Sequence, residues 1–192
     1  MSDVRIAVTI EGVTPLMINR FQVQENGKST PAHRTSNDDP REVAERCLYV
    51  GGNGELSPPY VPGWNLYKSI MQAGIYFKIG KRQITTGASS MLPGMVFIEE
   101  AILPITPKNW EVDSRPVRMP STGGRVIRHR PMFNQWKLKF HLSVDTELMD
   151  LKLLRDVVDA SGKRVGLGEF RPACKGMYGK FVVTNWRQLK GK

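Results

Sequence analysis

The chain has 192 residues, a hydrophobic fraction of 40% and four Trp, which suffices for one domain with a core and excludes global disorder. Its formal net charge is +10, but residues 108–140 hold eight Lys or Arg against two acids, and residues 161–192 hold eight against one. Two basic segments on a slightly acidic remainder favour a polyanion-binding surface, with an ordinary basic soluble protein as the alternative.

Cysteine and histidine are too scattered to indicate a metal site. Cys47 and Cys174 are the only cysteines, and the three His are isolated from them and from one another. We therefore expect no metal and no cofactor, while a disulfide between the two cysteines stays open. The N-terminal residues lack a signal pattern, and no apolar run approaches the roughly 18 residues of a membrane span. We expect a cytoplasmic protein of a prokaryotic or phage-infected cell, without membrane contact.

The first third of the chain begins with a predicted strand over residues 4–11, where β-branched and polar residues alternate. A short extended piece follows at 14–19. Residues 22–40 are polar and contain Gly and Pro, so they predict a mobile loop. Pro40 is expected to open a short helix capped by Asp39 and ending near Cys47. Residues 48–56 predict a small hairpin.

The middle of the chain predicts a helix over 64–79, because apolar residues recur there at helical spacing. Residues 80–94 are rich in Gly, Ser and Thr and predict a loop, and 95–105 predict a strand. Residues 107–131 predict a β-hairpin or flexible finger whose two arms flank a Pro-Ser-Thr-Gly-Gly turn. The finger is basic, since it carries five Arg within sixteen residues.

The last third has the clearest strand of the chain, at 136–144, where Trp, Leu, Phe, Leu and Val alternate with polar residues. An amphipathic helix is predicted over 146–160, capped by Asp145 or Thr146 and ended by Gly162, with its apolar face at Leu148, Leu151, Leu154, Val157 and Val158. A glycine-rich loop and a final strand at 180–186 follow. This order favours one α+β domain over residues 1–192, with a ferredoxin-like (RRM-like) βαββαβ core and the hairpin as an insertion.

The glycine-rich loop is the first candidate binding feature. Gly166, Gly168, Gly176 and Gly179 permit positive φ and close approach, and five cations surround them. Exposed amides in such a loop can form an anion nest. It is neither a Walker loop nor a dinucleotide fingerprint, because the required lysine, strand and helix are missing around it. The alternative is a turn whose glycines only close the fold.

The basic finger is the second candidate. Its arginines would neutralise phosphates, and interleaved apolar residues such as Met119 would stack on bases or insert between them. The alternative is a solvated charged hairpin. Catalytic signals are weaker: His33 with Asp38 and Asp39, or His129 among arginines, would be needed for acid–base chemistry, and neither has a partner that spacing alone can place.

Two segments carry a resemblance to a known family. Residues 59–70 (PYVPGWNLYKSI) resemble the proline-glycine helix opening that follows the first strand in the RAMP superfamily of CRISPR-associated proteins. Gly166-Leu167-Gly168 through Gly179-Lys180-Phe181 is similar to that superfamily's C-terminal glycine-rich loop. The likeness is greatest to the guide-RNA-binding backbone subunits of effector complexes, which polymerise along the guide and push a hairpin thumb between its segments. The Arg-His-Arg-Pro and Gly-Glu-Phe-Arg-Pro elements also resemble phage proteins.

The resemblance implies a thumb at 107–131 and a second insertion at 22–40. Lys68, Arg171, Lys175 and Lys180 would contact phosphates, and Met119 or Val126 near the thumb tip would wedge a base. The full set of candidate nucleic-acid-binding residues is Asn19, Arg20, Lys68, Arg115, Arg118, Met119, Arg125, Arg128, Arg130, Lys163, Arg164, Gly166, Gly168, Arg171, Lys175, Gly176, Gly179 and Lys180.

We therefore expect a non-enzymatic subunit that binds single-stranded guide RNA and oligomerises along it in an antiviral CRISPR-type ribonucleoprotein. Its partners would be the guide, copies of itself, other effector subunits and target DNA or RNA. One alternative is a phage protein that binds or anneals single-stranded DNA. A second is a RAMP-type endoribonuclease acting through a histidine or a loop aspartate, Asp38 or Asp39. A third is a viral structural protein that is basic for solubility or packaging.

Overall fold

A computed structural model describes most of the chain, namely residues 3–20, 39–51, 58–118 and 123–189. Its centre is an antiparallel sheet with the strand order β11 (Phe181–Leu189), β1 (Asp3–Gly12), β10 (Lys137–Asp145) and β6 (Val96–Ile98). The two long central strands β1 and β10 pair over nine residues. The strands predicted at 4–11, 136–144 and 180–186 are therefore present as β1, β10 and β11.

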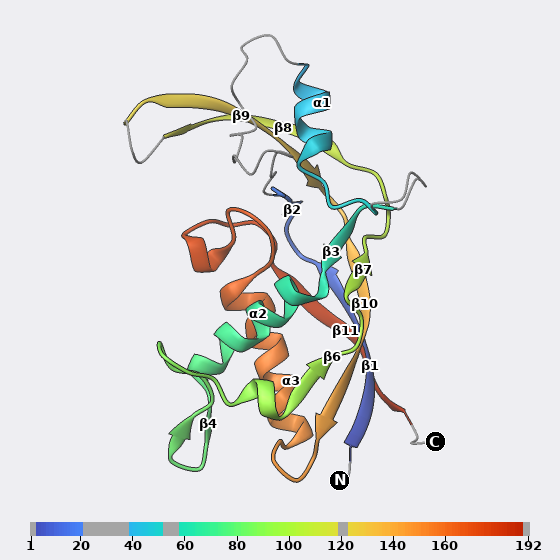
Figure 1. The fold of residues 1–192 in the computed structure, drawn as a ribbon, viewed down its shortest axis with the longest axis vertical. Helices are drawn as coiled ribbons and strands as arrows, with labels where there is room; N and C mark the ends of the chain where they lie inside the picture. Colours follow the sequence, from blue (N-terminus) through green and yellow to red (C-terminus); the bar gives the residue numbers. More distant parts are fainter. Residues whose placement is uncertain (1–2, 21–38, 52–57, 119–122, 190–192) are drawn as a thin grey trace, which may run out of the picture.

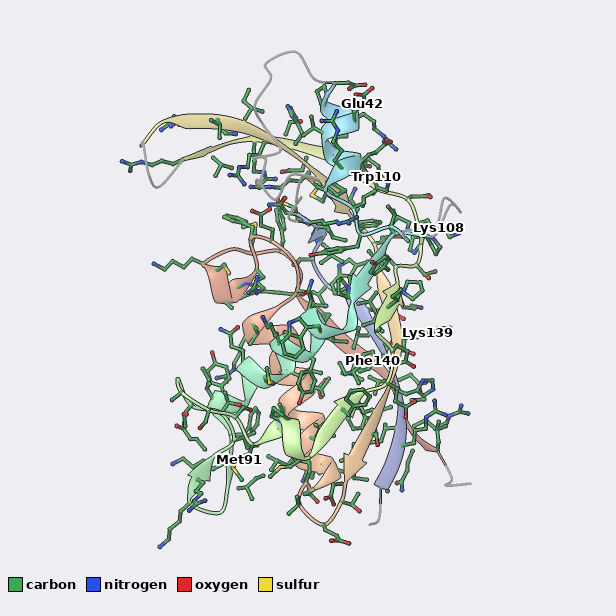
Figure 2. All side chains as sticks on the ribbon, in the orientation of Figure 1. Glu42, Met91, Lys108, Trp110, Lys139 and Phe140 are labelled. Atoms are coloured by element: carbon green, nitrogen blue, oxygen red, sulfur yellow. The ribbon has the colours of Figure 1, made fainter. Side chains whose placement is uncertain are left out.

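Two helices cover one side of this sheet. The helices α2 (Gly63–Ala73) and α3 (Leu151–Ala160) pack against each other and lie on the same side of β1, β10 and β11 (Figure 1). The predicted alternation along β10 is confirmed, because Leu138, Phe140, Leu142 and Val144 are all buried. Lys139, labelled beside Phe140 in Figure 2, is exposed on the other side of the strand. Helices segregated to one face of an antiparallel sheet make this an α+β structure.

A second, three-stranded sheet forms the arm that rises from the core in Figure 1. Strand β8 (Glu111–Arg118) pairs antiparallel with β9 (Arg125–Phe133), and the short strand β2 (Leu16–Met17) pairs with the base of β9. The two arms expected within 107–131 thus form a β-hairpin, whose turn residues 119–122 lie outside the described part. Met119, the expected wedge, is among them.

Helix α1 (Pro40–Arg46) packs against both strands of the hairpin. Asp39 caps it by accepting from the Arg41 N–H at 2.9 Å, and Pro40 opens it, as the sequence predicts. The Arg41 guanidinium lies 3.8 Å from the centre of the Trp110 ring, which Figure 2 labels below α1. The rest of the mobile loop expected at 22–40, and residues 52–56 of the hairpin expected at 48–56, lie outside the described residues.

Short elements connect these parts. Strand β3 (Tyr60–Pro62) pairs with β7 (Ile102–Pro104), and β4 (Lys78–Ile79) pairs with β5 (Arg82–Gln83). The remaining turns are the 3₁₀ segments η1 (Gly74–Tyr76), η2 (Leu92–Gly94) and η4 (Pro172–Cys174) and the π-helical turn η3 (Ser161–Val165). The loop predicted at 80–94 therefore contains a strand and a turn.

Three predicted boundaries were wrong. The helix predicted over 64–79 ends at Ala73, because the chain tightens into a 3₁₀ turn at Gly74, where a Cβ would press on the Thr85 hydroxyl oxygen. The strand predicted over 95–105 divides into β6 and β7, which belong to different sheets. The bend between them places the Ala101 carbonyl where it accepts from the Gly63 N–H at 2.9 Å.

The third wrong boundary concerns the helix predicted over 146–160. It begins only at Leu151, where the Asp150 side chain caps it by accepting from the Leu153 N–H at 2.8 Å. Leu148, expected on its buried face, precedes the helix and is 52% exposed. The helix also does not stop at Gly162, because the chain continues through η3 until Gly166 adopts a φ of 76°.

Candidate nucleic-acid interface

A cleft lies between α2 and the glycine-rich loop. Its volume is about 310 Å³, and both polar and apolar residues line it. Its lining residues are Leu16, Ile18, Asn19, Tyr49, Val61, Asn65, Lys68, Ser69, Gln72, Gly166, Leu167, Gly168, Glu169 and Arg171. The structure thus brings Asn19, Lys68, Gly166, Gly168 and Arg171, five of the predicted residues from three distant segments, to one place.

A second, wider hollow of about 820 Å³ continues from this cleft. Lys68, Gln72 and Arg171 line both hollows, so the two form one surface depression, here called the α2 groove. The far wall of the second hollow is a run of small residues from Thr85 to Ser90, four of which carry hydroxyl groups. The groove therefore offers two cations, amide side chains and hydroxyls, which suit phosphate and sugar oxygens, together with the Glu169 carboxylate.

The packing of α2 positions Lys68 on the groove side. Leu66, Ile70 and Ala73 of this helix are buried in the core, while Lys68 is exposed on the opposite face. The buried Ser69 hydroxyl donates to the Gly166 carbonyl at 2.9 Å and joins the helix to the glycine-rich loop. The groove walls are therefore held together by a buried hydrogen bond.

The amides of the glycine-rich loop do not form the expected anion nest. The Leu167, Glu169 and Gly179 N–H groups donate to the carbonyls of Gly179, Met17 and Pro15 at 2.8–2.9 Å. Gly179 has a φ of 67°, and a Cβ there would overlap the Leu167 carbonyl. Gly176 likewise lies against the Phe170 carbonyl. These glycines allow close backbone packing, and an anion at this loop would meet its side-chain cations.

The cations of the loop have different surroundings. Arg171 donates to the Gly168 carbonyl at 2.9 Å and is half-buried at the edge of the groove. Lys163, Arg164 and Lys175 are exposed, and the Arg164 guanidinium lies 4.6 Å from the centre of the Tyr76 ring. Lys180 is half-buried, and its N–H donates to the Thr14 hydroxyl at 3.0 Å.

The five arginines of the hairpin fall into two groups. Arg118 and Arg125 are opposite each other at its outer end, and both are exposed. Arg115 contacts Asp113, with Nε 2.7 Å from Oδ2, and donates to the Tyr178 hydroxyl of the glycine-rich loop at 3.0 Å. Hydrogen bonds with Asp113 and Tyr178 raise the pKa of Arg115.

Arg130 is buried at the base of the hairpin, with only 5% of its side chain exposed. Its Nε lies 2.7 Å from the Glu169 carboxylate, and its Nη1 lies 3.5 Å from the Met17 sulfur. Burial lowers the pKa of Arg130, and the Glu169 charge opposes that effect. Arg130 thus faces the protein interior rather than the expected phosphate, and it joins the hairpin to the glycine-rich loop.

Arg128 and Arg20 complete the predicted set. Arg128 is half-buried opposite Arg115, and its Nε is buried without a hydrogen-bond partner in the structure. Arg20 is exposed, and its N–H donates to the Cys47 carbonyl at 2.9 Å. Arg128 is therefore a cation at the hairpin base whose buried nitrogen has capacity for an acceptor.

Those residues considered for catalysis that the structure describes have structural contacts. The His129 Nδ1 lies 2.7 Å from the Ser114 hydroxyl on the neighbouring strand, Asp39 is engaged as a helix cap, and His33 and Asp38 lie outside the described residues. Cys47 is buried and Cys174 is exposed, both with free thiols.

The described residues also contain one group of side chains with metal-ligating atoms close together, Glu99, Glu100 and His141. Arg5 Nε is 2.8 Å from both oxygens of Glu99, and Glu100 accepts from the His141 N–H at 2.8 Å. The two carboxylates are thus already compensated by charged or polar partners. In the parts of the chain that the structure describes, no helix has the length and apolar character to cross a membrane.

The sequence analysis missed Asn65, Gln72 and the wall from Thr85 to Ser90. Asn65 and Gln72 lie on the outer face of α2 together with Lys68, and helical spacing from Lys68 would have found them. The hydroxyl wall had no local signal, because its position depends on how the segment after α2 folds back.

Comparison with known proteins gives a likeness in fold. No protein-family model and no curated protein matches the chain. One solved chain, from the cryo-EM structure of the Type III-B Cmr-beta complex bound to cognate target RNA, superimposes with a TM-score of 0.53 at 13% identity. The match covers 98% of this chain and 61% of that one, so this chain spans less than two thirds of the length of that subunit.

Proposed function

We propose that this chain binds single-stranded nucleic acid, foremost guide RNA, as a backbone subunit of a CRISPR-type effector ribonucleoprotein. The observation that carries the proposal is the α2 groove, where Lys68 and Arg171 converge from distant segments next to a basic hairpin. The fold likeness to a Cmr complex chain supports it.

The topology supports a ferredoxin-like core of the RAMP type. In chain order the central elements are β1, α2, β6, β10, α3 and β11, which is the pattern βαββαβ. The hairpin lies between the second and third of the four core strands in sequence, and the glycine-rich loop precedes the last. We infer that the hairpin is a thumb on this core.

A single strand would follow the α2 groove and continue along the hairpin. Lys68 and Arg171 would bind its phosphates, the hydroxyl wall its sugars, and Arg118 and Arg125 the next phosphates. No group of base-edge readers is evident among these residues, so affinity would depend on salt more than on sequence. The role is one of binding, with copies of the chain, other effector subunits and target strands as partners in a prokaryotic cytoplasm.

The first test is to purify the protein from a native-like host and sequence the nucleic acid that co-purifies. Uniform short RNAs that share a repeat-derived end are the expected result. Heterogeneous DNA, or a higher affinity for DNA than for RNA of the same sequence, would contradict the guide-RNA role and favour the phage alternative. RNA cleavage that His129→Ala abolishes would favour the endoribonuclease alternative.

A second test places binding in the groove. Lys68→Gln with Arg171→Gln is expected to weaken single-strand binding and to reduce the slope of log K against log salt by about 1.4, at about 0.7 per phosphate contact. The matched control is Lys152→Gln with Arg187→Gln, two exposed cations on α3 and β11 that do not line the groove. Equal effects of the two double variants would contradict a localised site.

A further inference from the structure

An apolar hollow lies between the start of α2 and β6. Its volume is about 350 Å³, and its walls include Trp64, Tyr67, Pro93, Val96, Phe97 and Glu100. The Trp64 ring is open to solvent, since Trp64 is 58% exposed, and the Tyr67 ring lies beside it. An exposed aromatic ring at an apolar hollow of this size forms a ligand-sized site, which the α2 groove does not include.

The hollow has a fixed floor. The Tyr67 hydroxyl donates to the Val96 carbonyl at 3.1 Å, and the Gly63 N–H donates to the Ala101 carbonyl at 2.9 Å. The absence of a Cβ at Gly63 lets the Glu100 carbonyl lie directly against the helix start. The Trp64 and Tyr67 rings are nearly parallel, 24° apart with centroids separated by 6.1 Å. The aromatic surface is therefore held in place without a ligand.

Trp64 connects this hollow to the α2 groove. Lys68 lies one helical turn after Trp64, and its Nζ is 5.0 Å from the centre of the Trp64 ring. The same Lys68 lines both hollows of the groove. A phosphate bound to Lys68 would thus lie close to the Trp64 ring, since the two residues are about one helical turn of 5.4 Å apart.

From this juxtaposition we propose that the hollow beside Trp64 is a stacking site for one nucleobase of a strand bound in the α2 groove. The inference rests on the proposed function. Stacking suits a strand of any sequence, because every base has a π-face. Of the two carboxylates at the rim, Glu99 is paired with Arg5, which offsets its repulsion of the strand, and Glu100 accepts from the backbone N–H of His141.

The test uses the full chain and two probes, an oligouridine and a strand of the same length in which the bases are removed. The unaltered protein is expected to prefer the strand with bases. Trp64→Ala should reduce affinity for that strand by about 5- to 150-fold, the equivalent of 1–3 kcal/mol for one stacked base, and leave affinity for the abasic strand unchanged. Trp64→Phe should retain most of the preference.

Two control variants separate the contributions. Lys68→Gln should weaken binding of both strands by the same factor, because it removes a phosphate contact. Leu148→Ala removes an equally exposed apolar side chain elsewhere and should change neither affinity. Trp64→Ala is not expected to unfold the protein, given the exposure of the ring, and circular dichroism checks this.

The failures are distinguishable. If the unaltered protein binds neither strand, the proposed function fails and the stacking site with it. If the protein binds both strands and Trp64→Ala keeps the preference for bases, or lowers both affinities equally, the stacking site is overturned while the binding function stands. A change in oligomeric state without a change in RNA affinity would also overturn it and would identify a protein-docking surface instead.

Discussion

The outer end and the base of the hairpin differ in what their arginines do. At the outer end, Arg118 and Arg125 extend into solvent from opposite strands. At the base, Arg115 is paired with Asp113 and Tyr178, and Arg130 is buried against Glu169. Residues of one type, evenly spread along one hairpin, are thus divided into groups available to a ligand and groups that join the hairpin to the rest of the protein.

This difference separates binding from stability. An exposed arginine gains affinity for phosphates at little cost to the fold, whereas a buried arginine must keep its counter-charge. Glu169, the acid in a glycine-rich loop that is otherwise basic, provides that counter-charge for Arg130. The orientation of the hairpin relative to the α2 groove therefore depends on a residue that itself lines the groove.

The largest expected effect comes from breaking the buried pair. Glu169→Gln leaves the Arg130 charge buried and uncompensated, and we expect it to lower the free energy of unfolding by about 3 kcal/mol, the lower end for a buried pair because Glu169 is 31% exposed. Urea unfolding monitored by tryptophan fluorescence measures this loss.

The matched control is the exposed pair between Lys137 and Glu11, where both side chains are 41% exposed. Glu11→Gln is expected to cost much less stability than Glu169→Gln, because water screens an exposed ion pair. In addition, the double variant Glu169→Leu with Arg130→Met should recover much of the stability that Glu169→Gln loses, because neither charge is then left buried. If Glu169→Gln and Glu11→Gln lowered the free energy of unfolding equally, the buried pair at the hairpin base would contribute no more to stability than an exposed pair.

A smaller effect, on binding alone, is expected at the outer end. Arg118→Gln with Arg125→Gln should leave the free energy of unfolding within about 0.5 kcal/mol of the unaltered protein. It should also reduce the slope of log K for single-strand binding against log salt by about 1.4. Fluorescence anisotropy with a labelled strand at several salt concentrations measures the slope. A drop in the free energy of unfolding without a change in slope would show that these two arginines stabilise the fold and do not bind the strand.

The sequence predicted local features well where one physical signal dominated. The alternation from Trp136 to Val144 placed β10 and its buried face correctly, and Asp39 with Pro40 marked the start of α1. Helix ends were less predictable, because they depend on tertiary packing. Helix α2 ends at Ala73, just before Gly74, where a Cβ would press on Thr85.

The candidate site was predictable only in part, for the same reason. Lys68 and Arg171 were chosen from their local motifs, and both line the groove. Arg128 and Arg130 are two residues apart in the same basic run, and nothing in their spacing indicates that one is buried against a loop forty residues away. The exposure of Trp64 at a helix start likewise depends on where β6 and its neighbours pack.

The smallest expected effect is a pH dependence of the free energy of unfolding, caused by a thiol at the buried side of the hairpin. Cys47 is fully buried there, with its sulfur 4.0 Å from the His129 carbonyl. Burial, and to a lesser degree the charge of Glu169, raises the pKa of the Cys47 thiol above its ordinary value of 9.0. The unfolded chain therefore loses this proton at a lower pH than the folded protein, so the contribution to stability is complete below pH 9.0 and declines above it. For one proton the decline is at most about 1.4 kcal/mol per pH unit.

The test compares the free energy of unfolding at neutral pH with that at pH 10, measured under reducing conditions. The loss between these two pH values should be smaller for Cys47→Ala than for the unaltered protein. Cys174→Ala, at the exposed cysteine, is the control and should leave the pH profile unchanged. If Cys47→Ala and the unaltered protein lost stability in parallel, the thiol would not be shielded, and the base of the hairpin would be as open to water as its outer end.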